Sequence, residues 1–116
     1  MYCFNYKTKT KTNTMIDYSK TVIYRLYCKE ETVKHVYIGY STNIKDRIGV
    51  HRRVCLYDNH KSHNQNTYRF IREHGGWTNW TYEILEEFPC TSKEEAKEKE
   101  REWFGIFDGE LLNTNR

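Results

Sequence analysis

The 116-residue sequence has no apolar run long enough to cross a membrane, and its first residues lack the pattern of a signal peptide. We therefore expect an intracellular protein that is neither secreted nor bound to a membrane. The four cysteines (Cys3, Cys28, Cys55 and Cys90) form no C-x-x-C pair, which argues against a zinc ribbon or a redox motif. Free thiols in a reducing compartment are the simplest interpretation, and a disulfide is the minority alternative.

A large excess of charge is also lacking, because the formal net charge is only +3 at pH 7. This value permits nucleic-acid binding, but any electropositive surface has to be local. Aromatic residues, in contrast, are plentiful, with ten Tyr, five Phe and three Trp. That composition favours a folded protein with a sheet over a disordered chain, and the length fits one domain with its own core.

The first part of the chain differs in composition from the rest. Lys and Thr alternate from Lys7 to Thr12, so we predict a polar, flexible tail over residues 1–20. An arm that follows a phosphate backbone is the alternative interpretation of this tail. We place the folded domain at residues 21–116.

Two strands and a turn are predicted at the start of this domain. The segment 21–28 is rich in β-branched and aromatic residues, and polar residues 29–32 follow it as a turn. Residues 33–39 then form the second strand of an antiparallel hairpin. Tyr24 and Tyr37 fall on neighbouring strands, where they can face the same side of the sheet.

A helix is predicted directly after this hairpin. Asn43 can cap it, and Asp46 falls at the third helical position, where a carboxylate is favourable. Arg47 and His51 are four residues apart and so share one helix face. They could converge with Tyr37, and the guanidinium of Arg47 suits phosphate oxygens. The alternative is that Arg47 and His51 are ordinary solvated helix residues.

The next elements are shorter. A polar loop is predicted over 57–64, and a short helix over 66–74 ends at Gly75 and Gly76. A third strand over 80–85 follows and is ended by Pro89. The last helix begins with a capping box, in which Ser92 is followed three residues later by Glu95.

One carboxylate of this last helix is out of place. Ala96, Trp103, Phe104 and Phe107 fall on one helix face, and Glu100 lies inside that apolar stripe. A carboxylate facing a core is costly unless its charge is compensated. A salt bridge, for which Arg47 is the candidate partner, and a metal ion are the two usual compensations.

Taken in order, these residues resemble the GIY-YIG nuclease superfamily. The resemblance covers roughly residues 21–113 and rests on Val22-Ile23-Tyr24, Tyr37-Ile38-Gly39, Arg47, His51, Glu100 and Asn113, although Val22 replaces the first glycine of the family name. The segment 74–77 and the acidic third strand look most like homing-type members of phages and large DNA viruses. The resemblance implies an α+β fold with a central three-stranded antiparallel sheet flanked by helices, in the order β-β-α-α-β-α, as read above.

The resemblance also implies an activity. It predicts an endonuclease that hydrolyses DNA phosphodiester bonds with one divalent ion, Mg²⁺ or Mn²⁺, and with Glu100 as the metal ligand. Arg47 would hold the scissile phosphate, and Lys45 and Arg52 on the same helix are predicted to bind substrate with it. Gly39 and Asn113 are predicted to be structural braces. A partner protein or a dimer is a possible source of target specificity.

The resemblance assigns the general base to Tyr24, with Tyr37 orienting the attacking water or the phosphate. At pH 7 only about 0.1% of an ordinary tyrosine is ionised, so we expect Arg47 and the metal–phosphate site to lower the pKa of Tyr24. His51 is the rival base, because its reference pKa suits neutral pH better. Two further alternatives are a nucleic-acid-binding module without catalysis and a structural domain in which Arg47 and Glu100 form a salt bridge.

Overall fold

The computed structural model describes residues 15–113, so most of the predicted tail (residues 1–14) lies outside the described residues. The elements follow the predicted order β-β-α-α-β-α, with two short 3₁₀ helices added. They are η2 (Tyr18–Lys20), β1 (Val22–Cys28), β2 (Val36–Ser41), α1 (Ile44–Leu56), α2 (Asn66–Glu73), η3 (Trp77–Asn79), β3 (Trp80–Glu87) and α3 (Lys93–Ile106).

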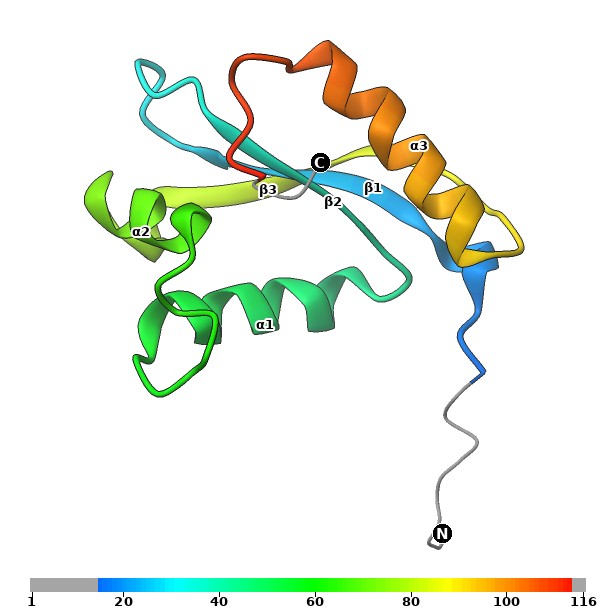
Figure 1. The fold of residues 1–116 in the computed structure, drawn as a ribbon, viewed down its shortest axis with the longest axis horizontal. Coiled ribbons are helices and arrows are strands. Elements are labelled where there is room, and N and C mark those ends of the chain that lie inside the picture. Colours follow the sequence, from blue (N-terminus) through cyan, green and yellow to red (C-terminus); the bar gives the residue numbers. More distant parts are fainter. Residues whose placement is uncertain (1–14, 114–116) are drawn as a thin grey trace, which may run out of the picture.

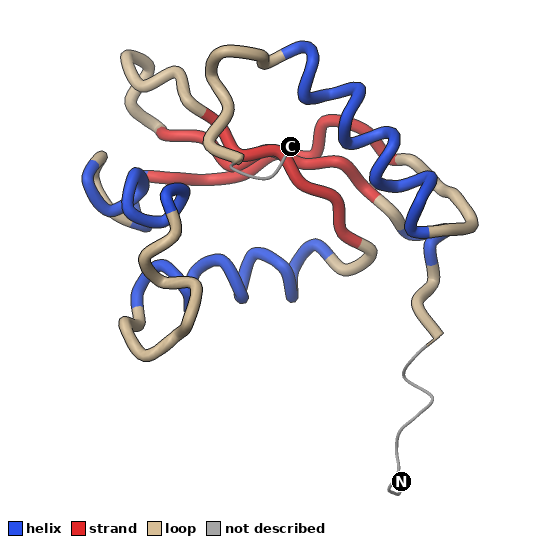
Figure 2. Tube along the Cα trace, in the orientation of Figure 1, coloured by secondary structure: helices blue, strands red, loops and turns tan. Residues whose placement is uncertain are grey.

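The three strands form one antiparallel sheet in the order β2-β1-β3, which confirms the predicted fold class. Helices α1 and α3 lie on opposite sides of this sheet (Figure 1), and the tube view shows the strands between them (Figure 2). Tyr24 pairs with Gly39 and Leu26 pairs with Tyr37. Because side chains alternate along a strand, Tyr24 and Tyr37 share one face, as the hairpin predicted.

The second strand begins three residues later than the sequence predicts. The backbone N–H of Val33 donates to the carbonyl of Glu30, which keeps residue 33 in the turn. The N–H of Val36 instead donates to the carbonyl of Glu110, 2.8 Å away, and the strand runs from there to Ser41. The predicted start at Val33 was wrong because this boundary depends on a distant segment.

Each face of the sheet has its own core. On one face, Tyr24 and Leu26 pack with Val54, Cys55 and residues of α2, including Ile71. On the other face, the buried side chains of β1 and β2 pack against Trp103, Phe104 and Phe107. The apolar stripe predicted for the last helix therefore covers the second face of the sheet.

The segment after α3 closes the outer edge of β2. Leu111 forms a parallel bridge with Val36, and the N–H of Leu112 donates to the carbonyl of Val36. The side chain of Asn113 accepts a hydrogen bond from the N–H of Ile38 at 3.0 Å and donates to the carbonyl of the same residue at 2.7 Å. These contacts tie the end of α3 to the strand that carries Tyr37.

The structure bears on the state of the cysteines and on the presence of a membrane-spanning helix. Cys28, Cys55 and Cys90 are free thiols, whereas Cys3 falls outside the described residues. Within residues 15–113, no helix has both the length and the apolar character of a membrane span.

Candidate active site

A cavity of about 450 Å³ opens at the end of β2, between α1 and α3. It is lined by Tyr37, Tyr40, Ser41, Thr42, Arg47, Lys97 and Glu100. Three of the residues singled out from the sequence, Tyr37, Arg47 and Glu100, thus come together from one strand and two helices. The sheet edge and the two helix faces supply all of these side chains.

The start of α1 places Arg47 at this cavity. The side chain of Asn43 accepts a hydrogen bond from the N–H of Asp46 at 3.2 Å, which caps the helix as the sequence predicts. The hydroxyl of Ser41 in turn accepts from the N–H of Asn43 at 2.9 Å. The turn is therefore held at both ends, so that Arg47 lies in the first turn of the helix and His51 one turn further on.

Arg47 is half-buried and interacts with the hydroxyl groups of Tyr24 and Tyr37. Among residues 15–113, the ion pairs are Arg25–Glu83, Lys99–Glu86 and Lys99–Glu102, and none of them involves Arg47 or Glu100. The predicted alternative of an Arg47–Glu100 salt bridge is therefore absent from the described part of the chain. The charge of Arg47 is left directed at the cavity.

Behind Arg47, three buried side chains form a hydrogen-bonded row. The hydroxyl of Tyr24 lies 2.7 Å from Nε2 of His51, and Nδ1 of His51 lies 2.8 Å from the hydroxyl of Tyr68. Tyr24 and His51 are 0% exposed and Tyr68 is 7% exposed. The interpretation of His51 as an ordinary solvated helix residue is wrong, because the helix face that carries it packs against the sheet.

Burial changes the acid–base properties of this row. It raises the pKa of Tyr24 well above the ordinary value, with a further contribution from Tyr37, and the opposing effect of Arg47 is smaller. Arg47 does act to lower the pKa of Tyr24, as expected, but burial outweighs it, and the share expected from the metal–phosphate site stays a prediction. Burial, helped by the charge of Arg47, lowers the pKa of His51 to about 3, so this imidazole is neutral at physiological pH.

Gly39 leaves the space that Tyr24 occupies. A Cβ atom at position 39 would lie 2.7 Å from the hydroxyl oxygen of Tyr24 and 2.8 Å from its Cζ. Any other residue would have to displace the tyrosine ring, because both groups belong to paired strands of the sheet. The glycine therefore determines where the Tyr24 hydroxyl can lie.

Glu100 is half-buried in the wall of the cavity. Burial raises the pKa of its carboxyl group, while Lys97 and the backbone of Tyr40 oppose that shift. Within residues 15–113 no three His, Cys, Asp or Glu side chains cluster in a way that could hold a metal ion. A lone carboxylate facing an open cavity suits Mg²⁺, which keeps several waters and also binds phosphate oxygens.

The two predicted substrate-binding residues besides Arg47 lie away from the cavity, and two other residues were missed. Lys45 and Arg52 are exposed on α1 and do not line the cavity. Lys97 was missed, although its position three residues before Glu100 puts it on the same helix face. Tyr68 was missed as a polar partner, because nothing local in the sequence connects its hydroxyl with His51.

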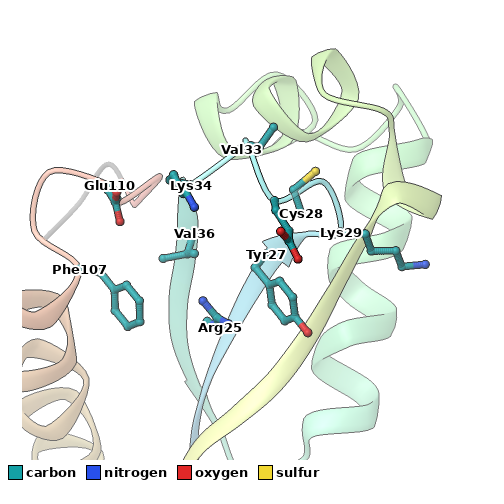
Figure 3. Close-up of a pocket in the computed structure, with 10 residues that line it drawn as sticks. Arg25, Tyr27, Cys28, Lys29, Val33, Lys34, Val36, Phe107 and Glu110 are labelled. Atoms are coloured by element: carbon teal, nitrogen blue, oxygen red, sulfur yellow. The ribbon is translucent and has the colours of Figure 1, made fainter.

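A second cavity, of about 400 Å³, lies toward the other end of β1 and β2 (Figure 3). Its lining includes Arg25, Tyr27, Phe107 and Glu110. The guanidinium carbon of Arg25 lies 4.2 Å from the centre of the Tyr27 ring, and Nε of Arg25 is bonded to the carboxylate of Glu83. This arginine therefore already has a carboxylate and an aromatic ring as partners within the protein.

One comparison with known proteins gave a match, and it spans all the elements that line the first cavity. The family model of the GIY-YIG catalytic domain matches residues 20–108, which include Tyr24, Tyr37, Arg47, His51 and Glu100. No curated protein sequence and no solved structure matched the chain significantly. Because the family model covers most of the chain, the protein belongs to the GIY-YIG family of endonucleases, enzymes that hydrolyse phosphodiester bonds.

Proposed function

We propose that this domain cuts DNA at the cavity lined by Tyr37, Arg47 and Glu100, using a single divalent ion, Mg²⁺ or Mn²⁺. One observation carries the proposal: Arg47 and Glu100 come from opposite sides of the sheet to one cavity and form no ion pair with each other. A half-buried arginine and a half-buried carboxylate that share one wall without forming an ion pair are costly in a purely structural domain. They suit a substrate that brings a phosphate to the arginine and a metal ion to the carboxylate.

Arg47 is the proposed phosphate-binding residue. Its planar guanidinium can donate two parallel hydrogen bonds to phosphate oxygens. The donor is already held in place by the capped turn and the two tyrosine hydroxyls, so little reorganisation is needed when charge develops on the phosphate. Lys97, exposed on the rim of the same cavity, adds a positive charge that would attract the DNA backbone.

Glu100 is the residue that would hold the metal ion. Burial already disfavours its ionised form, and a divalent cation would compensate that cost. When bound, the ion would supply Lewis-acid stabilisation of the negative charge on the phosphate and on the departing oxygen.

Tyr24 is proposed as the immediate acceptor of the proton from water, with His51 behind it. The attacking oxygen forms a bond to phosphorus as its proton moves to the hydroxyl of Tyr24, and the Tyr24 proton moves to Nε2 of His51. The phosphorus–oxygen bond to the leaving group breaks and that oxygen takes a proton from solvent, while the proton held by His51 returns through Tyr24 to solvent, which restores the neutral ring. Tyr24 and His51 are both fully buried, and of the two Tyr24 is the one that is hydrogen-bonded to Arg47 of the cavity wall. Tyr37 would orient the attacking water.

A cleavage assay tests this proposal. Purified protein should nick supercoiled plasmid DNA in Mg²⁺ or Mn²⁺ and should leave it intact in EDTA. The same assay on linear, branched and single-stranded DNA would define the substrate. Cleavage in EDTA would contradict the metal dependence. Binding without cleavage of any of these DNAs would favour the alternative of a non-catalytic nucleic-acid-binding module.

We further predict that the protein is related to the homing-type members of the family, that a partner protein or second copy supplies target specificity, and that the protein is intracellular.

A further inference from the structure

We propose that Tyr68 is a positioning residue for this reaction: its hydroxyl holds His51 in the tautomer that leaves Nε2 free to take the proton of Tyr24. The inference rests on the proposed function for its catalytic meaning and on two hydrogen bonds for its geometry. Tyr68 does not line the cavity, and it would act only through His51.

The direction of the hydrogen-bonded row follows from what each group can donate or accept. Arg47 has only donors, so toward Arg47 the Tyr24 oxygen can act only as an acceptor. The proton of Tyr24 therefore needs another acceptor. Among the hydrogen bonds of the described residues, Nε2 of His51 is the partner of this hydroxyl, at 2.7 Å. A buried hydroxyl that does not donate is costly, so the proton of Tyr24 points at Nε2.

The direction of the Tyr24–His51 hydrogen bond determines whether the other ring nitrogen, Nδ1, carries a proton. The His51 side chain is buried and neutral, so its ring carries one proton only. Because Nε2 accepts from Tyr24, that proton is on Nδ1. Nδ1 donates it to the oxygen of Tyr68 at 2.8 Å. The row therefore runs from the cavity inward, from Tyr24 through His51 to Tyr68.

Among residues 15–113, Tyr68 is the group that is hydrogen-bonded to Nδ1 of His51. The groups that face His51 are Tyr24 on β1, Tyr37 on β2, Arg47 on its own helix and Tyr68 on α2. Without the Tyr68 oxygen, a proton on Nδ1 would be buried without an acceptor. The tautomer with the proton on Nε2 would then be favoured, and Nε2–H would point at Tyr24 and block its proton.

The first experiment measures the tautomer directly in the wild-type protein. Two-dimensional ¹H–¹⁵N NMR of histidine side chains separates a protonated from an unprotonated ring nitrogen, and the His51→Gln variant assigns the signals. We expect Nδ1 of His51 to carry the proton at pH 7. A proton on Nε2 would overturn the proposal, and this measurement does not require that the protein cut DNA.

The second experiment uses Tyr68→Phe, which keeps the ring and removes only the hydroxyl. The matched control is Tyr57→Phe, at an exposed residue just after α1. We expect Tyr68→Phe to shift His51 toward the Nε2–H tautomer and to lower kcat at least about tenfold, as loss of the productive tautomer does elsewhere. KM should stay within about twofold, because Tyr68 contacts no substrate.

An unchanged tautomer in Tyr68→Phe, or a kcat equal to that of the control, would overturn the proposal. The tautomer measured in the wild-type protein still decides the hydrogen-bond assignment if Tyr68→Phe does not fold. If the wild-type protein cuts no DNA in Mg²⁺ or Mn²⁺, the proposed function fails, and the NMR measurements separately show whether Tyr68 orients His51.

Discussion

The two cavities contain the same kinds of residue in different arrangements. Each has an arginine, a tyrosine and a glutamate in its wall, and their volumes are similar, about 450 and 400 Å³. In the second cavity (Figure 3), Arg25 is paired with Glu83 and lies over the ring of Tyr27. In the first, Arg47 has tyrosine hydroxyls as neighbours and forms no ion pair within the described residues.

The difference shows that residue type alone does not make a reactive site. A paired arginine stabilises the fold, and an arginine without a carboxylate partner can bind an anionic ligand. The comparison can be tested by making the same change in each cavity and comparing the losses of activity.

The largest effect is expected for Glu100→Gln. This substitution removes the proposed metal ligand while it keeps the shape of the side chain, so cleavage in Mg²⁺ should fall below detection. The melting temperature should not fall, because burial disfavours the charge that is removed. Glu110→Gln in the second cavity is the matched control and should keep its activity within about twofold of wild type, the range of a surface change. Near wild-type cleavage by Glu100→Gln would show that Glu100 does not hold the metal.

Tyr24→Phe should come next, with a loss of roughly 10²–10⁴ in rate, as expected for a general base. Tyr27→Phe, in the second cavity, is the control and should change the rate little. His51→Ala should cost less than Tyr24→Phe, and its residual activity should rise with pH as phenol ionisation becomes easier. These variants should be compared from pH 6 to 10.

The reverse order, with an active Tyr24→Phe and a nearly inactive His51→Ala, would make His51 the base. Equal and modest losses in both variants would contradict both assignments. They would indicate a water activated by the metal ion alone.

Arg47→Ala should lower kcat at least about a hundredfold, the scale for one transition-state donor. Arg47→Lys should restore only part of the rate, because an ammonium group lacks the planar fork. The same two substitutions at Arg25 should leave kcat within about threefold and change mainly the melting temperature, since an exposed ion pair contributes about 1 kcal/mol or less. Full activity of Arg47→Lys would show that charge alone is sufficient.

The smallest effect is on stability rather than on rate. The pKa of His51 is about 3 in the folded protein and about 6.5 in an unfolded chain, so folding favours the neutral ring. The stabilisation is complete above about pH 6.5 and is lost as the pH falls toward 3, by up to roughly 1.4 kcal/mol per pH unit.

Urea unfolding at pH 4–7 tests this effect. As the pH falls, the free energy of unfolding should decrease more steeply for wild type than for His51→Gln. His60→Gln, at an exposed histidine, should follow the wild type. Parallel curves for His51→Gln and wild type would mean that His51 is not buried as a neutral ring.

The parts of the fold that depend on local spacing could be predicted from the sequence. The cap at Asn43, the end of α2 before Gly75 and the apolar stripe around Glu100 each depend on residues within a few turns of one another. The start of β2 could not be predicted, because a hydrogen bond from Val36 to the carbonyl of Glu110 determines it. Nothing near residue 36 in the sequence encodes that partner.

The candidate site also has features that could be predicted from the sequence and features that could not. Tyr37, Arg47 and Glu100 were identified from spacing and resemblance, and the structure places them around one cavity. Arg47 was expected to lower the pKa of Tyr24 and does so, but the larger, opposite effect of burial could not be predicted, because the loss of hydration depends on how deeply α1 and α2 cover the ring. Tyr68 was missed as a polar partner because its hydroxyl meets His51 only after α2 packs against α1.

The closure of the β2 edge by residues 110–113 has a consequence for the order of protein synthesis. Glu100 and the segment that binds Val36 and Ile38 are among the last of the described residues to leave the ribosome. Tyr24, Arg47 and His51 emerge much earlier, without their carboxylate and with the edge of β2 still open. A growing chain therefore lacks the carboxylate of the cavity until Glu100 is available, and the edge of β2 stays open until residue 113 is available.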